Sequence, residues 1–458
     1  MPSTPESHQP SATSLQQFVG AGHLRCRHDS TWDCTFTITR LFNGRLQVSV
    51  IPGVRRSSSK GLSKWVRQCE PFALEGTDER GNQISASDIY FARSILGPQK
   101  TLLGYIHSSA RIRCPQPDPD VITVTCELTN FQCISLAVYP LAVQIAGFLI
   151  EIGRLSQEWR IGEHNNAYQY AGIASYLQVG EIPAVEHDGV LECAHRVAQL
   201  LSIAQRRYVF LVAQHKHDIE DRWLESQFNE PVFTRCGWPR ALIPDDALAE
   251  FLTAAYPSLA SKYQRLELGN VIDHYLQALT LRSVWPSSLG VFTAMETLRA
   301  AFFRQSTDIE DRKSEYWVVP DDTFGIEAEL LDEFIDLLSN HFPRFGRLSG
   351  SERQSLKAQL RNLNRRSYRT QLRRMLNQLG VDYDRRELQP FIDMRNRIIH
   401  YGTPAPSDVP TADYAQRTSR ASRDINDATS LFERALLAAL GYAGPRELFN
   451  AEEGRTHA

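Results

Sequence analysis

WDCTFTITRLFNGRLQVSV, residues 32–50, contains the strongest secondary-structure signal in the chain. Apolar and polar side chains alternate over residues 32–39 and again over residues 46–50, which is the period of a half-buried strand. The pair Asn43-Gly44 lies between the two runs and favours the tight turn of a β-hairpin. The N-terminal part of the chain is therefore expected to be β-rich.

The pattern of apolar residues changes from strand-like to helical near the middle of the chain. Alternation returns over residues 122–128, whereas residues 190–206 have helical spacing. Several prolines, Pro257 the last of them, interrupt residues 230–260, and the sequence beyond them is helical. We expect an α+β multidomain protein, whose segments are a disordered tail over 1–14, a β-rich sensor or regulatory domain over 15–245, an all-α helical domain over 259–445 and a frayed tail over 446–458.

Composition narrows the class of protein. The net charge of the 458 residues is −3, so a nucleic-acid site would have to be local. The eight cysteines and the lack of a signal peptide predict reduced thiols and a cytoplasmic location. Residues 128–150 carry no charge, but Asn130 and Pro140 interrupt them, which favours buried strands over a membrane helix. No membrane partner is expected.

Charge is strongly segregated within residues 304–385, which we interpret as a charged insertion in the helical domain. Residues 308–336 contain eleven acidic and two basic side chains. A basic stripe follows at four-residue spacing: Lys357, Arg361, Arg365, Arg369 and Arg373. The stripe is an RNA-binding track, a solvated face, or a partner for the acidic residues 308–336 within or between subunits. Only Tyr368 interleaves as an aromatic residue, whereas single-stranded RNA tracks usually stack several bases, which counts against the RNA-binding interpretation.

A candidate catalytic motif lies near the C-terminus, where residues 395–402 read RNRIIHYG. On a helix over residues 388–401, Arg395 falls on the apolar side, and a charge facing a core needs a partner. We expect this partner to be Glu296, set in an apolar helix over residues 287–303. Glu296 is then either part of a functional site or only a helix–helix ion pair.

Asn396 and His400 are four residues apart and share an adjacent face of the same helix. An imidazole exchanges protons at neutral pH, and a guanidinium matches phosphate oxygens. These groups are sufficient to cleave RNA by attack of the ribose 2′-hydroxyl on phosphorus, with no metal and no cofactor. We interpret Arg395 and His400 as catalytic, Asn396 as positioning, and Tyr401 as a supporting residue that stacks on a base or packs.

The motif and its helical surroundings, over about residues 259–440, resemble the HEPN domain of ApeA-like abortive-infection proteins, which are bacterial antiphage ribonucleases. The N-terminal run over residues 22–91, with WDC at 32–34 and FALEG at 72–76, looks like the ApeA N-terminal domain. The family pattern falls on Arg395, Asn396 and His400. The resemblance implies an all-α HEPN bundle that forms a homodimer or a higher even-numbered oligomer, and that cuts RNA when a phage-derived trigger is sensed.

Other chemistries have weaker support. Cys26, His28, Cys34 and Cys69 lack a Cys-x-x-Cys pair, so buried thiols are favoured over a zinc site. Residues 215–218, HKHD, are interpreted as an exposed charged loop. No P-loop, HExxH or GxSxG motif occurs. The rival to an endoribonuclease is a non-catalytic RNA-binding or dimerisation module whose β domain senses a partner.

Overall fold

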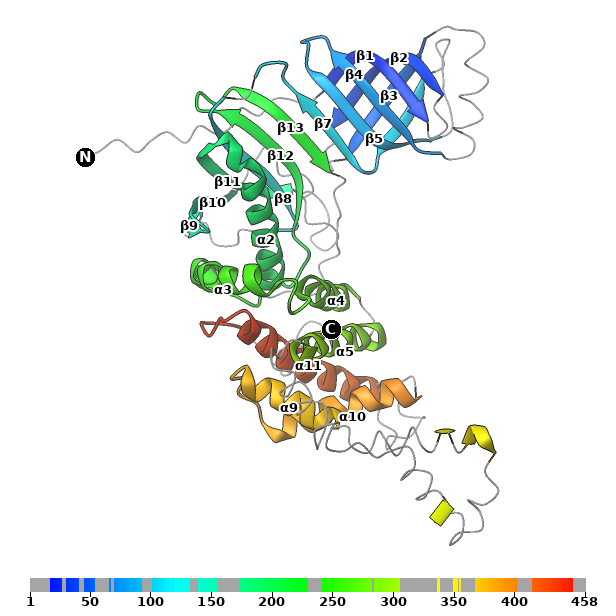
Figure 1. Ribbon diagram of the computed structural model, residues 1–458, viewed down its shortest axis with the longest axis vertical. Helices are drawn as coiled ribbons and strands as arrows, with labels where there is room; N and C mark the ends of the chain where they lie inside the picture. The colour runs from blue at the N-terminus through cyan, green and yellow to red at the C-terminus, as the bar shows by residue number, and fades with distance from the viewer. Residues whose placement is uncertain are drawn as a thin grey trace, which may run out of the picture. The chain divides into compact units, whose positions relative to one another are not determined.

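The computed structural model divides the chain into two compact units, Met1–Pro257 with Gly444–Glu447, and Ser258–Ala443 with Leu448–Ala458. Figure 1 labels the elements of both units. The division falls within the proline-rich stretch named above, although Pro257 itself lies inside helix α3 (Leu248–Lys262). The residues that the structure describes are 17–26, 30–40, 45–53, 66, 70–92, 101–117, 119–131, 139–154, 173–229, 241–281, 284–304, 336–337, 349–352, 354–355, 367–401 and 414–447.

The first unit is built on one antiparallel sheet with the strand order β4-β1-β2-β3-β6-β5-β7-β13-β12-β8-β11-β10-β9. Its strands are β1 (Gln17–Cys26), β2 (Thr31–Arg40), β3 (Leu46–Pro52), β4 (Phe72–Asp78), β5 (Gln83–Ala92), β6 (Leu102–Ile106), β7 (Ser109–Arg113), β8 (Val121–Thr129), β9 (Leu141–Ile145), β10 (Phe148–Arg154), β11 (Ile173–Pro183), β12 (Phe210–Asp218) and β13 (Trp223–Asn229).

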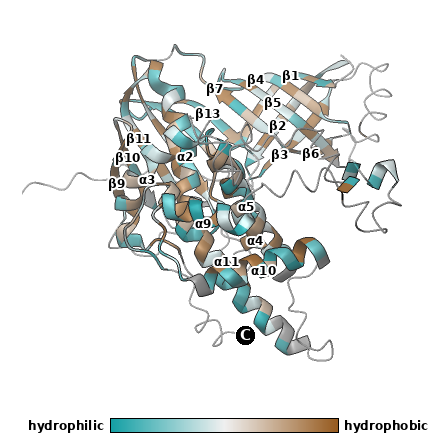
Figure 2. Ribbon diagram, turned by 60° about the horizontal axis from the view of Figure 1, so that its bottom comes forward, coloured by the Kyte–Doolittle hydropathy of each residue, from teal (hydrophilic) through white to brown (hydrophobic). Residues whose placement is uncertain are grey.

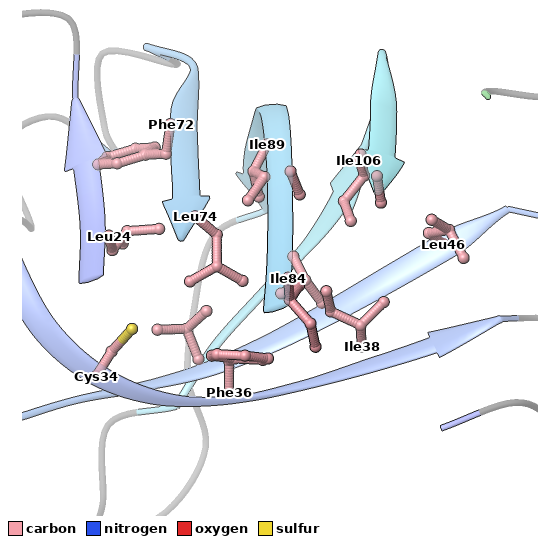
Figure 3. Close-up of a cluster of buried hydrophobic side chains, with 14 of the residues drawn as sticks. Leu24, Cys34, Phe36, Ile38, Leu46, Phe72, Leu74, Ile84, Ile89 and Ile106 are labelled. Carbon is pink, nitrogen blue, oxygen red and sulfur yellow. The ribbon is translucent and has the colours of Figure 1, made fainter. Parts of the chain in front are cut away.

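Strands β1 to β6 close into a barrel, because β4 pairs with β5 as well as with β1. The alternation seen in the sequence fills this barrel: in β2 every second side chain, from Trp32 to Ile38, is buried. Figure 2 shows the same alternation of hydrophobic and hydrophilic residues along the barrel strands. Figure 3 shows side chains from facing strands meeting in the interior, among them Phe36 and Leu74.

The expected hairpin is confirmed, since β2 and β3 pair antiparallel with Phe36 opposite Val50. Its turn residues, Asn43 and Gly44, lie outside the described residues. Strands β1 and β4 approach closely where Gly22 faces Gly76. The approach is so close that a Cβ on Gly22 would lie 2.1 Å from the Glu75 carbonyl oxygen. Only glycine fits such an approach without moving the backbone.

In the rest of the sheet, β8, β11 and β12 pack against helix α2 (His187–Gln205). Figure 1 shows α2 running across the face of these strands. The described part of the uncharged stretch at residues 128–150 supplies the end of β8, then β9 and the start of β10, so the expected strands are present. They are only half-buried, since Leu149 is exposed while Val143 and Ile150 are buried. A short 3-10 turn, η2 (Ala184–Glu186), joins β11 to α2, and another, η3 (Asp245–Ala247), precedes α3.

The interpretation of residues 215–218 as an exposed loop was wrong, because they belong to β12. Lys216 and Asp218 are buried there, and Asp218 Oδ2 accepts a hydrogen bond of 2.6 Å from Arg222 Nε. Cys26 and Cys34 are free thiols in the barrel core. His28 and Cys69 lie outside the described residues.

The second unit is a helical bundle of α4 (Leu268–Thr280), α5 (Val284–Arg304), α9 (Tyr368–Gln378), α10 (Arg385–Tyr401) and α11 (Tyr414–Ala439). Helix α5 packs on α4, α9 and α11, and α10 packs on α11. Phe292 of α5 and Phe391 of α10 meet with ring centroids 4.6 Å apart, in the edge-to-face arrangement that aromatic pairs prefer. Among the described residues, no helix is both long and apolar enough to cross a bilayer.

Two sequence-based boundaries look different in the structure. Helix α9 falls inside the expected insertion at residues 304–385, yet it packs on α5 and buries Leu372, Met375 and Leu376. The insertion therefore contains a helix of the bundle. Glu447, expected in the frayed tail, donates its backbone N–H to the Leu242 carbonyl at 2.8 Å and belongs to the first unit.

Candidate active site

The candidate site is centred on an ion pair between α5 and α10. Arg395 Nε donates to Glu296 Oε1 at 3.1 Å, and Arg395 Nη2 lies 3.1 Å from the same oxygen. The pairing predicted from the sequence is therefore present. The side chains are 24% and 29% exposed, which places the charges at the edge of the bundle, reachable from solvent.

A second arginine uses the other carboxylate oxygen. Arg299, one helical turn after Glu296, donates from Nη2 to Glu296 Oε2 at 2.8 Å and from Nε at 3.2 Å. Its Nη1 donates to Oε1 of Gln371, a buried residue of α9. Glu296 thus holds two guanidiniums, one on each oxygen, and Arg299 extends the network to a third helix.

Tyr368, the first residue of α9, lies against both guanidiniums. Arg395 Cζ is 4.5 Å from the centroid of its ring and Arg299 Cζ is 5.3 Å from it, both within range of a cation–π interaction. Among the residues that the structure describes, none hydrogen-bonds with the buried Tyr368 hydroxyl. Burial, and then the charge of Glu296, raise the pKa of Tyr368 while the two arginines oppose the shift, so the hydroxyl is neutral at pH 7.

The cluster carries an excess of positive charge, because two guanidiniums face one carboxylate. A partly buried site with one surplus positive charge favours a monoanion such as a phosphodiester. The carboxylate is also what allows two like charges to lie so close together. Its removal would leave both guanidiniums without an ionic partner, at a cost of about 1–3 kcal/mol.

Asn396 and His400 lie on α10 beside this cluster. Arg395 Nη1 donates to Asn396 Oδ1 at 3.2 Å, so the amide fixes part of the guanidinium. His400 is exposed in the last turn of the helix. Five residues of α-helix separate the Arg395 and His400 backbones by about 7.5 Å along the axis and about 140° around it. Tyr401 is helical, and its side chain lies outside the described part of the chain.

The basic stripe is only partly described. Arg369 and Arg373 are exposed on α9, one turn apart. Lys357, Arg361 and Arg365 lie outside the described residues. Tyr368, the aromatic residue within the stripe, has its ring against Arg395 and Arg299. A base therefore cannot use this ring face while the arginines occupy it.

A second ion pair on the same helix provides a comparison. Arg397 Nη2 donates to Asp424 Oδ2 of α11 at 3.2 Å, and the side chains are 17% and 19% exposed. Burial raises the pKa of Asp424 even though Arg397 lies beside it. Arg420 and Arg423 also act on Asp424, so several arginines share this acid too. The pair joins α10 to α11 and serves structure.

Another polar cluster lies in the first unit, where Glu127 of β8 binds Arg40 and His215. Arg40 Nη1 donates to Glu127 Oε1 at 2.9 Å, and His215 Nε2 lies 3.1 Å from the same oxygen. His215 Nδ1 lies 2.7 Å from Ser226 Oγ. This order resembles a hydrolase triad, but Ser226 is 2% exposed and Trp223 Nε1 donates to its Oγ at 2.7 Å. An oxygen so enclosed does not reach a substrate, and we assign the cluster to structure.

Sequence reasoning did not identify Arg299, Tyr368 or Gln371 as parts of the site. A signal for Arg299 was present, since it follows Glu296 by three residues and so shares its helix face. The packing of α9 on α5 brings Tyr368 and Gln371 to the site. No local sequence pattern predicts this packing.

Comparisons of the chain with protein-family models, with curated proteins and with solved structures find no match. The function of the protein is therefore inferred from the residues of the site.

Proposed function

We propose that the protein is an endoribonuclease that cleaves RNA by attack of the ribose 2′-hydroxyl on the adjacent phosphorus. The observation that carries the proposal is the Glu296–Arg395 ion pair, which holds a half-buried guanidinium on α10, the helix in whose last turn His400 is exposed. An oriented guanidinium and an accessible imidazole are the groups that this reaction requires.

Each residue has a role in the proposed reaction. The imidazole of one His400 removes the proton from the 2′-hydroxyl, and an imidazole or water protonates the departing 5′-oxygen. Arg395 stabilises the charge that develops on the phosphorane, and Asn396, which accepts from Arg395 Nη1, keeps the guanidinium in place. The products are a 2′,3′-cyclic phosphate and a 5′-hydroxyl. No step requires a metal or a cofactor.

The active species is proposed to be a homodimer or a higher even-numbered oligomer. The side chains of Arg395 and His400 project from α10 in directions about 140° apart. One copy of the helix is therefore poorly placed to bring both side chains to the same phosphate. A two-fold axis near the end of α10 would bring a second imidazole to the same phosphate, because such an axis presents the same patch from both copies. The exposure of His400 is consistent with this arrangement.

The surroundings of the site support RNA as the substrate class. Arg369 and Arg373 are exposed on α9, the helix that also supplies Tyr368 to the site. Such residues bind phosphates without reading sequence. On the resemblance to ApeA-like abortive-infection proteins, we propose further that the enzyme acts in antiphage defence and that the β unit senses a phage-derived trigger.

The test is cleavage of a labelled RNA by the purified protein in EDTA, with His400→Ala beside the wild type. Removing a general acid–base group lowers the rate by about 10²–10⁴-fold. His400 is exposed, so the variant should melt at the wild-type temperature. His274→Ala is the matched control, because His274 lies in the same unit on α4.

Cleavage that is lost in His400→Ala and kept in His274→Ala supports the proposal. Equal cutting by the wild type and His400→Ala would refute it. RNA binding by a wild-type protein that cuts nothing, with or without added divalent metal, would support the rival function of a non-catalytic RNA-binding module.

A further inference from the structure

Arg395 is held by hydrogen bonds to Glu296 and Asn396 and by the ring of Tyr368. Glu296 Oε1 binds the Nε and Nη2 side of the guanidinium, each at 3.1 Å, and Asn396 Oδ1 binds Nη1 at 3.2 Å. These contacts engage the N–H groups of the guanidinium. The Tyr368 ring adds a contact of another kind, with Arg395 Cζ 4.5 Å from its centroid, within range of a cation–π interaction.

The ring matters more than the hydroxyl in this arrangement. The Tyr368 hydroxyl is buried, and no partner for it occurs among the described residues. It is therefore no candidate to contact a substrate. The ring is engaged by two guanidiniums, with Arg395 Cζ 4.5 Å and Arg299 Cζ 5.3 Å from its centroid. A neutral aromatic ring offers a negative face to both cations, which a charged or aliphatic side chain does not do.

The position of Tyr368 is itself fixed. It is the first residue of α9, and Ser367 caps that helix, its Oγ accepting from the Thr370 N–H at 3.2 Å. Gln371, one turn further on, accepts from Arg299 Nη1. Buried Leu372, Met375 and Leu376 anchor the same helix in the bundle. Because these contacts anchor α9 in the bundle, they also fix the position of the Tyr368 ring beside Arg395.

We propose that Tyr368 is a positioning residue that sets the orientation of the Arg395 guanidinium for the transition state. The inference rests on the proposed ribonuclease function and deepens it. Stabilisation of a developing charge depends on donors that are already oriented, and small misplacements of such groups are costly in rate. Loss of the ring should therefore lower kcat and leave KM nearly unchanged, because ground-state RNA binding relies on other phosphate contacts.

The experiment measures RNA cleavage by full-length Tyr368→Phe and Tyr368→Leu. Tyr368→Phe keeps the ring face and should retain kcat within about threefold. Tyr368→Leu removes the face and should lower kcat by at least about tenfold, with KM changed less than about twofold. Tyr368→Met, a flexible unbranched side chain without a ring, replaces Tyr368→Leu if that variant fails to fold by circular dichroism.

A background variant separates positioning from general loss of structure. Arg395→Lys has a point charge in place of the planar group. If Tyr368 acts through Arg395, then Tyr368→Leu should change kcat less than about twofold when it is combined with Arg395→Lys. An equal loss in both backgrounds would overturn the inference, because a structural defect acts whichever side chain is at position 395.

The outcomes also separate this inference from the proposed function. A wild-type protein that does not cleave RNA refutes the function, and the inference with it. A wild-type protein that cleaves RNA, together with a folded Tyr368→Leu variant of unchanged kcat, overturns the inference alone.

Discussion

Glu296 Oε1 accepts a hydrogen bond from Arg395 Nε at 3.1 Å, a contact between α5 and α10 that spans 99 residues of sequence. The opposite oxygen of the same carboxylate binds Arg299. One acid therefore decides where two guanidiniums lie. Stability and activity should both depend on Glu296, and the two effects can be separated.

Glu296→Gln keeps the shape of the side chain and removes its charge. We expect the free energy of unfolding of the bundle to fall by about 1–3 kcal/mol, because two partly buried guanidiniums lose their ionic partner. RNA cleavage should fall as well, because Arg395 is no longer held. Urea unfolding and a cleavage assay measure the two effects.

Glu387→Gln is the control for Glu296→Gln. Glu387 pairs with Arg434 at 2.9 Å and is 38% exposed, so its loss should cost about 0–1 kcal/mol. Cleavage should be unaffected. If the two variants lose the same stability and the same cleavage activity, then Glu296 is no more important to the fold or to the activity than an exposed ion pair.

Arg395→Ala and Arg397→Ala form a matched pair on one helix. Each removes a half-buried arginine from an interhelical ion pair, Arg395 from Glu296 and Arg397 from Asp424. Similar losses of stability are expected, on the order of 1–3 kcal/mol. Cleavage should be lost in Arg395→Ala and kept in Arg397→Ala when both are assayed below their melting temperatures. Comparable activity in the two folded variants would argue against a catalytic Arg395.

Arg369 and Arg373 should contribute to RNA affinity through phosphate contacts. Each phosphate neutralised on a single strand adds about 0.7 to the steepness of log K against log salt concentration. Arg369→Gln combined with Arg373→Gln should therefore reduce that slope by about 1.4 if each arginine binds one phosphate. Fluorescence anisotropy at several salt concentrations, in the non-cleaving His400→Ala background, measures it.

Arg304→Gln is the control for the charge change in this binding experiment. Arg304 is exposed on α5 and already paired with Glu267 at 2.7 Å. Its replacement should leave the slope unchanged. An unchanged slope in the double variant as well would exclude the described part of the basic stripe from RNA binding.

The first unit should lose stability in acid, because Glu127 becomes protonated. Burial by itself raises the pKa of Glu127, but Arg40 and His215 outweigh it, so the folded-state pKa lies below the ordinary value of 4.5. An acid with a lowered pKa stabilises the fold fully above its unfolded pKa, and that stability is lost as pH falls towards the folded pKa. The free energy of unfolding should therefore decline below about pH 4.5.

Glu127→Gln tests the assignment of that acid-sensitive stability. The variant should be less stable than the wild type by about 3–5 kcal/mol at pH 7, because Arg40 is left buried without its partner. The difference between the two proteins should shrink as pH falls below 4.5. Urea unfolding between pH 3 and 7 measures both. A constant difference across this range would show that Glu127 is not the titrating group.

The parts of the fold that the sequence predicts are those set by local patterns. The barrel hairpin follows from alternation around Phe36 and Val50, because the side chains of a strand face opposite sides in turn. The partner of Arg395 can also be predicted, because a charge on the apolar face of a helix requires an opposite charge. Glu296 is the acidic residue that interrupts an otherwise apolar helix.

The parts that the sequence did not predict are set by tertiary packing. Gln371 and Tyr368 lie about 70 residues from Arg299 in sequence, and α9 carries them to the site by burying Leu372 and Met375 against the bundle. The charged residues of β12 were misread for a related reason. Asp218 is buried because Arg222, four residues later, supplies its hydrogen bond, and a hydropathy pattern does not contain that information.

The most direct test of the central claim is the dependence of cleavage on one hydroxyl of the substrate. The wild-type protein would be incubated in EDTA with an RNA, and with the same RNA carrying a single 2′-deoxynucleotide on the 5′ side of a mapped cut. We predict that the RNA is cut there to leave a 2′,3′-cyclic phosphate, and that the deoxy substrate is not cut at that position. Cutting of both substrates at the same rate would contradict the account.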